Sequence, residues 1–437
     1  MSGDVKYLDP EIECAPRELM REIQSKKLCQ TAARAYRKVP FYKQKFDGMG
    51  IKPEDIKGID DIKKLPFTEK TDLRDNYPFG LFAVGDDEIV RIHASSGTTG
   101  KQTVVGYTKQ DCENWARSVA RGLTSIGVTK SDKIHISYGY GLFTGGLGLH
   151  DGAGYLGAAA IPVSSGNTAR QIQILQDFRS DVLCCTPSYA MFIGESIRDA
   201  GIDPKSLKVR LGIFGAEPWT EGMRKKIEEL LDVKAIDIYG LSEIAGPGVS
   251  CECYAQNGMH VQEDFYYPEI INPDTLEQMP DGEYGELVFT CIGKEALPLI
   301  RYRTRDICKL TREVCECGRT TVRMAKPQGR ADDMLIIRGV NVFPSQVEFV
   351  LTSLGLEPNY MIVVDRVNNT DRMTVKVEIS GSILSDTIGG IEKHEQEISQ
   401  KMLSTLGIAA KIKLVEPKSL PRSEGKAKRV IDNRILD

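Results

Sequence analysis

Between residues 89 and 240, short β-rich runs alternate with longer segments of helical periodicity. The runs are IVRIHAS, KIHISYG, DVLCCT, VRLGIFG and VKAIDIYG, and the segments between them include QDCENWARSVARGLTSIG, RQIQILQDF and TEGMRKKIEELL. Strands separated by helices of this length predict a parallel sheet with helices packed on it. The alternation therefore predicts an α/β fold.

The two flanks of this region have different patterns. Residues 16–46 place apolar side chains at helical spacing, whereas EYGELVFTCIG and DICKLTR predict antiparallel strands. The segment GRADDMLIIRGVNVFP then opens a smaller unit, in which PSQVEFVLTSLG predicts a helix and YMIVVDR and MTVKVEIS predict strands. The 437 residues are too many for one compact core.

We therefore expect a large N-terminal domain with parallel-rich sheets flanked by helices over residues 1–331, mainly helical over 1–75. A small α+β C-terminal domain is expected over residues 332–437. The boundary is placed at Asp332, in a double aspartate between a polar turn and a new strand. Taken alone, this dipeptide favours a plain loop over a hinge.

Composition narrows the kinds of partner. The formal net charge of −4 argues against a broad nucleic-acid surface, because phosphate binding usually needs a basic face. No run approaches ~20 uninterrupted apolar residues, and MSGDVKYLDPEIECAPRELM lacks the apolar core of a signal peptide. We expect a cytoplasmic protein with small-molecule substrates, no membrane contact and a homodimeric assembly. Its eleven cysteines are not expected to form a disulfide framework.

The loop Ser95-Ser96-Gly97-Thr98-Thr99-Gly100-Lys101 has a dense set of hydrogen-bond donors and follows a predicted strand. Its two glycines allow tight turns in which consecutive N–H groups converge on an anion. The hydroxyls and the ammonium add donors to phosphate oxygens. The spacing differs from a Walker A motif, which has four residues between its first glycine and the Gly-Lys pair. Similar clusters occur in ordinary loops, but this pattern favours phosphate binding.

Three further motifs follow along the chain: Gly215–Pro218, Tyr239–Glu243 and Tyr302–Asp306. The first two end predicted strands of the parallel sheet, where ligands of open α/β sheets bind. Tyr239 is suited to stack on a base, Glu243 to bind magnesium with phosphate oxygens, and Asp306 to accept hydrogen bonds from ribose hydroxyls. Each motif alone also fits a plain turn or a surface ion pair.

Taken in order, these segments resemble the adenylate-forming superfamily, most closely the phenylacetate–coenzyme A ligase family. The resemblance rests on SSGTTGKQTVVGYT, GAEPW, YGLSEIAGPGV, EDFYYPEIINP, KEALPLIRYRTRD, GRADDMLIIRGVNVFPSQVE and PRSEGKAKRVID, which span residues 95–432. It implies a mobile C-terminal domain and two half-reactions. A carboxylate first attacks the α-phosphate of ATP, which releases pyrophosphate, and the thiol of coenzyme A then displaces AMP from the acyl-adenylate.

The resemblance also implies roles for single residues. Lys426 is the catalytic lysine, Glu243 is catalytic and binds Mg²⁺, and Asp332 is the hinge. The residues implied in binding ATP and AMP are Ser95, Ser96, Gly97, Thr98, Thr99, Gly100, Lys101, Ala216, Glu217, Pro218, Asp237, Tyr239, Gly240, Ser242, Asp306 and Arg330. An ammonium on a mobile loop would stabilise the charge that gathers between the carboxylate and the α-phosphate. Without the resemblance, GKAKR fits a solvated basic turn better.

The chain departs from the family at two of these motifs. Gln102 follows Lys101 where a proline is usual, which we do not expect to alter the chemistry. Arg305 stands where the wider superfamily often has glycine, but it agrees with the closer family.

The segment Tyr138–Gly146 matches the part of the family that lines the acyl pocket. Tyr138 and Phe143 supply flat apolar walls, and Gly145 and Gly146 leave room for a ring. Phenylacetate is the leading substrate, and the function implied is phenylacetate catabolism. Indole-acetate, benzoate-like and hydroxylated aryl acids would require a similar pocket. For each aromatic side chain, the alternative role is packing in the core.

Two close cysteine pairs predict a structural zinc site. We assign Cys253, His260, Cys315 and Cys317 as ligands, with Cys251 as the alternative to Cys253. Buried free cysteines are the competing interpretation, because C-x-C is less usual than C-x-x-C in zinc sites. With four protein ligands, such a site would be closed and would take no part in acyl chemistry.

Two other functions compete with ligation to coenzyme A. Some relatives transfer AMP to another acceptor, as in coenzyme F420 adenylylation. A non-catalytic nucleotide- or zinc-binding protein is a different class. Lys426, Glu243 and Asp306 argue against the latter, since a binding module has no need of a lysine on a distant loop.

Overall fold

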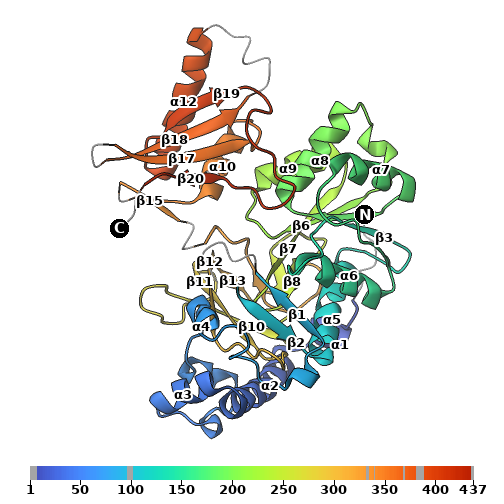
Figure 1. Cartoon of the computed structure of the whole chain (residues 1–437), viewed down its shortest axis with the longest axis vertical. Coiled ribbons are helices and arrows are strands. Elements are labelled where there is room, and N and C mark those ends of the chain that lie inside the picture. Colours follow the sequence, from blue (N-terminus) through green and yellow to red (C-terminus); the bar gives the residue numbers. More distant parts are fainter. Residues whose placement is uncertain are drawn as a thin grey trace.

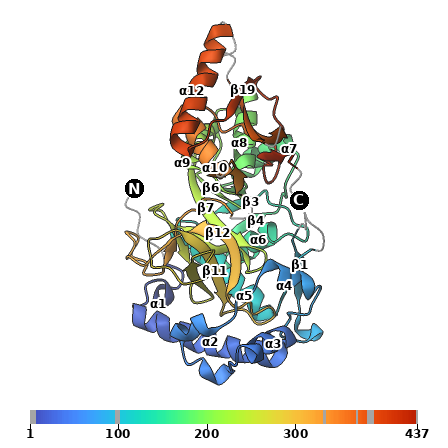
Figure 2. The same ribbon diagram turned by 90° about the vertical axis from the view of Figure 1, so that its left-hand side faces the viewer.

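The computed structural model describes residues 7–95, 102–330, 334–338, 340–367, 370–379 and 388–434. A large unit carries a smaller one at the end of the molecule away from the N-terminal helices (Figures 1 and 2). In the described part of the chain, no helix is both long and apolar enough to cross a membrane. All eleven cysteines lie in this part and none forms a disulfide.

Among the described residues, nine strands form the central sheet in the order β13-β14-β9-β8-β7-β6-β5-β3-β4. The strands β3 to β7 run parallel, and the other four extend the sheet antiparallel. The bounds are β3 Lys133–Ile136, β4 Ala159–Ile161, β5 Val182–Cys185, β6 Leu211–Gly215, β7 Lys234–Leu241, β8 Gly246–Glu252, β9 Met259–Val261, β13 Leu310–Thr311 and β14 Arg323–Met324.

Helices cover both faces of the parallel strands. Successive side chains of a strand point to opposite faces of the sheet, so a strand that is apolar throughout needs cover on both faces. In β5, Cys184 packs into the cluster that contains Trp115 and Leu149, whereas Cys185 packs with Tyr189 and Phe214. The first cluster includes α5 and α6, and the second includes α7, α8 and α9. The bounds are α5 Lys109–Ser125, α6 Gly145–Leu156, α7 Thr168–Phe178, α8 Pro187–Asp199 and α9 Glu221–Leu231.

One predicted strand lies outside this sheet. IVRIHAS was expected among the parallel strands, but β1 Arg91–Ala94 pairs antiparallel with β2 Val104–Tyr107 in a ribbon of its own. The prediction was wrong because β-propensity carries no information about which strand is the partner. The ribbon brings the two ends of the predicted phosphate loop together.

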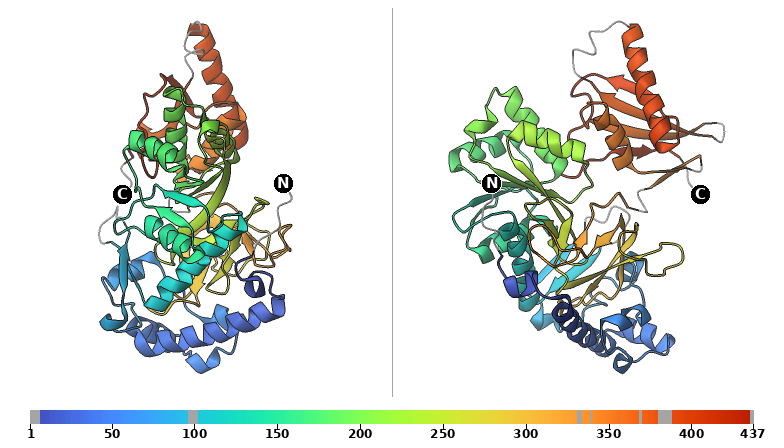
Figure 3. Two further views of the ribbon diagram at one scale, coloured as in Figure 1. Left: turned by 90° about the vertical axis from the view of Figure 1, so that its right-hand side faces the viewer. Right: turned by 180° about the vertical axis from the view of Figure 1, so that it is seen from behind.

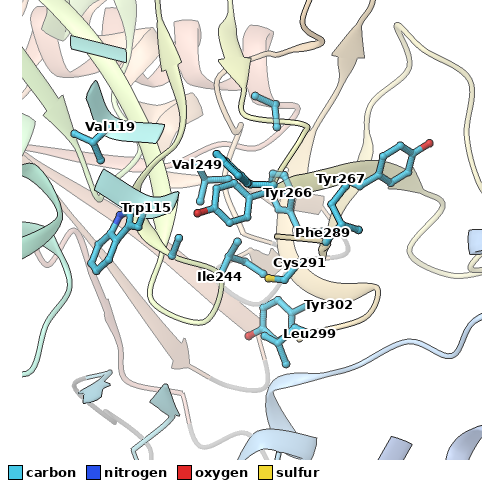
Figure 4. Packing of buried hydrophobic residues seen from close by; sticks show 14 of the residues in the cluster. Trp115, Val119, Ile244, Val249, Tyr266, Tyr267, Phe289, Cys291, Leu299 and Tyr302 are labelled. Atoms are coloured by element: carbon cyan, nitrogen blue, oxygen red, sulfur yellow. The ribbon is translucent and has the colours of Figure 1, made fainter. Parts of the chain in front are cut away.

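A three-stranded antiparallel sheet packs beside the central one, as EYGELVFTCIG and DICKLTR predicted. Its order is β10-β11-β12, with β10 Tyr266–Ile271, β11 Gly285–Cys291 and β12 Tyr302–Cys308. Figure 4 shows where this sheet meets α5: Val249 and Ile244 lie between Trp115 on one side and Tyr266 and Cys291 on the other. The same apolar cluster therefore supports both sheets.

The N-terminal region is helical, as predicted. Its helices are α1 Pro10–Glu13, α2 Arg17–Lys38, α3 Pro40–Gly48 and α4 Lys70–Asp75, and short 3₁₀ helices cover Pro53–Asp55, Ile59–Lys64, Asp86–Glu88 and, further on, Pro204–Ser206. Pro40 ends one helix and begins the next, since proline lacks the N–H that a continuing helix needs. Figure 3 shows α2 and α3 along the base of the large unit.

The small unit is built on a four-stranded sheet in the order β19-β18-β17-β20. The predicted strands β17 and β18 are antiparallel, and the edge strands β20 and β19 run parallel to them. The bounds are β15 Leu335–Ile337, β16 Val340–Val342, α10 Pro344–Ser353, β17 Tyr360–Val367, β18 Thr370–Glu378, α12 Ile388–Leu406, β19 Lys411–Val415 and β20 Val430–Asp432. The predicted hinge, Asp332, lies outside the described residues.

Candidate active site

Two of the predicted motifs lie at one edge of the central sheet. The parallel strands β6 and β7 are neighbours, so Ala216–Pro218 and Tyr239–Glu243 come together at their carboxyl ends. A Cβ on Gly240 would lie 1.5 Å from the Gly246 carbonyl oxygen. Only glycine therefore allows the tight return from β7 to β8 that places Ser242 and Glu243 at this edge.

Tyr239, Asp306 and Arg330 meet beside these strand ends. The Tyr239 hydroxyl donates to Asp306 Oδ2 at 2.5 Å. The Tyr239 ring stacks on the Phe289 ring, with a distance of 6.3 Å between the ring centroids. Asp306, on β12, forms a β-bridge with Arg330. Burial, followed by the charge of Asp306, raises the pKa of Tyr239, so its hydroxyl stays a donor. These contacts bring one carboxylate and one aromatic ring, both predicted to bind a nucleoside, into direct contact with each other.

Glu243 has a cationic neighbour that the sequence did not indicate. Its mostly buried carboxylate lies 3.5 Å from Lys70 Nζ, at the start of α4. Two residues earlier, Thr68 pairs with the backbone of Arg301 and Arg303, which fixes the segment against β12. The predictions treated residues 1–75 only as a helical region. The Thr-Glu-Lys sequence offers no recognisable motif, and only the fold brings Lys70 to the site.

The predicted phosphate loop begins at the end of β1. Ser95 N donates to the Thr103 carbonyl at 2.9 Å, and Thr103 N donates to Ser95 Oγ at 3.1 Å. These bonds close the base of the loop. Ser96, Gly97, Thr98, Thr99, Gly100 and Lys101 lie outside the described residues, so their predicted role stays a prediction.

Asp237 lies within β7, two residues before Tyr239, and is buried. Burial raises the pKa of its carboxyl to about 6, and the ammonium of Lys326, 3.9 Å away, only partly opposes this. The Asp237 amide donates to Glu252 Oε2 at 2.8 Å. The side chain is therefore set into the sheet below the strand end rather than on its rim.

The segment Tyr138–Gly146 runs from the end of β3 into α6. The Tyr138 hydroxyl donates to the Cys185 carbonyl at 2.5 Å, so it is engaged by the sheet. A Cβ on Gly145 would lie 2.8 Å from Phe143 Cε1 and 3.3 Å from Tyr138 Cδ1, so both rings lie close to this glycine. Thr144 Oγ1 lies 3.2 Å from Ser242 Oγ and joins this segment to the nucleotide motifs. The segment Tyr138–Gly146 therefore contacts the strand-end motif that contains Ser242.

The small unit brings Lys426 to the same edge. The Thr186 hydroxyl, directly after β5, donates to the Gly425 carbonyl at 2.9 Å, and the Ala427 amide donates to Glu217 Oε2 at 2.8 Å. Lys426 itself is exposed. A cavity of about 830 Å³ opens between the two units, and its lining includes Glu217, Pro218, Arg330, Glu348, Tyr360 and Arg429.

A separate cluster joins strand β9 to two loops of the large unit. The Sγ and imidazole atoms of Cys253, His260, Cys315 and Cys317 all lie within 4.8 Å of one another, and all four residues are buried. The Cys253–Cys315 Sγ distance is 3.7 Å, and Cys317 Sγ lies 3.4 Å from His260 Nε2. Zn–S bonds of ~2.3 Å in a tetrahedron imply S–S distances of about 3.8 Å. The geometry therefore fits a tetrahedral zinc ion.

The surroundings of the cluster are those of a closed metal site. His260 Nδ1 contacts Thr321 Oγ1 at 2.9 Å, which orients the ring as outer partners of metal ligands do. A hydrogen bond with Cys253 lowers the pKa of Cys317 and favours the thiolate that zinc needs. Cys251, the alternative ligand, lies outside the cluster and packs beside Gly122.

Comparisons with known proteins agree with this geometry. The AMP-binding enzyme family matches residues 60–292, and the AMP-binding enzyme C-terminal domain matches residues 339–434. A 2-hydroxyisobutyryl-CoA ligase in the postadenylation state superposes with a TM-score of 0.92 at 29% identity, covering 99% of this chain and 94% of that one. The same ligase in the thioesterification state, with CoA, gives 0.72 at 31% identity, covering 97% and 92%.

The fold and the strand-edge site thus define an AMP-binding enzyme of the adenylate-forming class. Phenylacetate-coenzyme A ligase of Thermus thermophilus is 49% identical over 97% of this chain and 99% of its own length. The Escherichia coli enzyme of that name is 50% identical over 98% of each chain. The chain belongs to the phenylacetate–coenzyme A ligase family.

Proposed function

We propose that the protein activates phenylacetate with ATP and transfers the acyl group to coenzyme A, with release of AMP and pyrophosphate. The observation that carries this proposal is the near-full-length identity of about half to relatives named phenylacetate-coenzyme A ligase. The site supports it, because Tyr239, Asp306 and Glu243 share one edge with the turn of Lys426. In the first step, the substrate carboxylate attacks the α-phosphate and pyrophosphate leaves. In the second, the thiol sulfur attacks the acyl carbon and AMP leaves.

Residue roles follow from where the side chains lie. Asp306 would accept hydrogen bonds from the ribose, Tyr239 would cover the base, and Lys426 would meet the charge that develops on the α-phosphate and carboxylate oxygens. Ser95 to Lys101 would hold the phosphates. Glu243 supplies the carboxylate oxygens that Mg²⁺ prefers, and the bound ion would neutralise phosphate charge. We retain Asp332 as the hinge and residues 1–331 and 332–437 as the two domains.

The domain arrangement supports the order of events. This chain superposes better on the postadenylation form of the hydroxyisobutyryl ligase than on its thioesterification form. This likeness supports assigning the contact of the Lys426 turn with the large domain to the first half-reaction. The second would require the small domain to turn away.

The substrate is tested by measuring AMP release with ATP, coenzyme A and a panel of acids. We expect kcat/KM for phenylacetate to exceed that for acetate by at least ~10²-fold, because a phenyl ring buries on the order of 100 Å² at ~25 cal/mol per Å². Release that does not depend on coenzyme A would instead favour the F420-adenylylation type of transfer. A better rate with acetate or a long fatty acid would overturn the aryl-acid assignment, and a preference for indole-acetate would revise it.

We also propose that Cys253, His260, Cys315 and Cys317 hold one structural zinc ion. Elemental analysis after dialysis should find about one zinc per chain, and metal removal should lower thermal stability more than it alters the chemistry of the folded enzyme. Cys315→Ser should lose the metal. Cys251→Ala, a neighbouring buried position outside the cluster, should retain it. Full reactivity of all eleven thiols in a folded, zinc-free protein would contradict the assignment.

A homodimer and a cytoplasmic location complete the proposal. Light scattering on the purified protein tests the first, and fractionation of cells that produce it tests the second.

A further inference from the structure

The turn that carries Lys426 is held at both ends by carboxylates of the large domain. Before the turn, Arg422 Nε donates to Glu195 Oε2 at 3.1 Å. After the turn, the Ala427 amide donates to Glu217 Oε2 at 2.8 Å. Glu195 lies on α8, and Glu217 follows β6, so the two contacts reach different elements of the large domain. The red segment before β20 runs alongside α8 and α9 in Figure 1.

Each carboxylate uses both of its oxygens. Glu217 Oε1 accepts from the Ser188 amide at 2.7 Å, at the start of α8, which fixes the carboxylate within its own domain. Glu195 Oε1 accepts from Asn359 Nδ2 of the small domain at 2.9 Å. The sequence predicted that Glu217 contacts adenine, but it did not predict the contact with Ala427. The two residues are 210 positions apart, and sequence alone does not reveal such contacts.

Arg422 lies between two acids, one from each domain. Besides Glu195, it donates two parallel hydrogen bonds to Glu378 on β18, at 2.8 and 2.7 Å. Glu378 therefore orients the guanidinium inside the small domain whatever the domain arrangement, and Glu195 meets it only when the domains dock. The Glu195 side chain is 6% exposed in the docked arrangement. Without Arg422, this buried carboxylate would keep only one hydrogen-bond donor from the small domain, Asn359.

The turn between the two contacts is internally braced. Ser423 Oγ donates to the Lys426 carbonyl at 2.8 Å and accepts from the Gly425 amide at 3.2 Å. A braced turn moves as one piece, so fixing its two ends fixes the backbone of Lys426. A small error in the placement of a reacting group is enough to lose much of the rate.

We propose that Glu195 and Glu217 are positioning residues for Lys426 in the adenylation half-reaction alone. This inference rests on the proposed role of Lys426. When the small domain turns away for the second half-reaction, both contacts are broken, and neither carboxylate influences attack by the thiol.

The test compares the two half-reactions in single turnover. Glu195→Gln keeps the shape of the side chain and removes its charge. We expect it to slow acyl-adenylate formation at least ~10-fold, the scale of a hydrogen bond to a charged group. Thioester formation from supplied acyl-adenylate and coenzyme A should stay within about twofold of wild type, and the KM for ATP should not change.

The matched control is Asp199→Asn, one turn further along α8. Asp199 pairs with Lys418 of the small domain across the same interface, but the two side chains are 43% and 62% exposed. An exposed pair contributes little, so this variant should lose less than about twofold in either half-reaction. Glu217→Gln, at the other end of the turn, should also slow adenylation and can replace Glu195→Gln if that variant folds poorly. An unchanged KM for ATP separates this loss from a loss of the adenine contact predicted for Glu217.

Two outcomes would overturn the proposal: adenylation within about twofold of wild type in both glutamine variants, or an equal loss in both half-reactions, which is the mark of a damaged fold. Lys426→Ala measured alongside separates this failure from that of the proposed function. If Lys426→Ala does not slow adenylation, the role of the lysine fails, whereas a slow Lys426→Ala with normal glutamine variants overturns only the positioning role.

Discussion

Loss of the Lys426 side chain should separate the two half-reactions. It is exposed on a turn docked at the carboxyl ends of β5 and β6. Lys426→Ala should lower adenylation by ~10²-fold or more, the scale for deleting a preorganised charge, while thioester formation from supplied acyl-adenylate is largely retained. Rapid-quench measurement of each half-reaction checks this.

Lys413→Ala is the control for removing a positive charge from the same domain. Lys413 is exposed on β19, away from the docked turn, and both half-reactions of this variant should be unchanged. Adenylation by Lys426→Ala within about threefold of wild type would remove the lysine from its proposed role.

The residues that the sequence did not reveal are those whose role depends on contacts between distant parts of the chain. Asp306 and Tyr239 stand in motifs and were predicted to bind one nucleoside; the structure joins them by a hydrogen bond. Lys70 and Glu195 stand in no motif, and each reaches the site across a distance in sequence that no local pattern encodes. Motifs of neighbouring residues can be recognised in a sequence, but the pairing of charged side chains that are distant along the chain cannot.

At the scale of elements, periodicity predicted β3, β5, β6 and β7 together with α5, α7 and α9, but not β4, α6 or α8. The alternation also explains why Cys184 and Cys185 face opposite clusters. The ribbon of β1 and β2 was misplaced, and the edge strands β19 and β20 were not predicted. Strand pairing is decided by packing partners rather than by propensity, so these assignments required the fold.

The entry into α6 should control the aromatic pocket. A methyl group on Gly145 would lie 2.8 Å from Phe143 Cε1 and 3.3 Å from Tyr138 Cδ1, so the rings would have to move. Gly145→Ala should raise the KM for phenylacetate about tenfold, since overpacking costs ~1–3 kcal/mol. The KM for ATP should stay within about twofold, because the nucleotide motifs lie on other loops. Steady-state kinetics with each substrate varied checks both values.

Gly154→Ala provides the comparison within the same helix. Gly154 is exposed in α6, and a methyl group on it would meet nothing within 4 Å beyond the backbone of its own helix. Alanine should therefore add ~0.5–1 kcal/mol of stability through helix propensity. The kinetic constants of this variant should not change. Equal KM values for phenylacetate in the two variants would argue that Tyr138 and Phe143 pack the core and do not line the pocket.

At the scale of the whole molecule, the two domains meet through carboxylates that are buried only when the domains dock. Glu348 on α10 is 3% exposed and accepts from the Thr220 amide and hydroxyl of the large domain, at 3.1 and 2.8 Å. Burial raises the pKa of Glu348, the positive charge of Arg429 opposes this, and Glu217 adds to it. Turning the small domain away would return this carboxyl to water and to its ordinary pKa.

This difference predicts the pH dependence of docking. Because the pKa of Glu348 is higher in the docked arrangement, docking takes up a proton. Docking is favoured at pH values below the ordinary pKa of the carboxyl, and it weakens as the pH rises through the raised pKa of Glu348. Glu348→Gln removes the titration, so the ratio of its adenylation rate to that of wild type should rise from about pH 5.5 to about pH 8.5. Single-turnover adenylation across this range measures the ratio, and Glu397→Gln, an exposed carboxyl on α12, should give a flat one. A ratio for Glu348→Gln that is flat or falls with pH would show that Glu348 stays ionised in the docked interface, held there by Thr220 and Arg429.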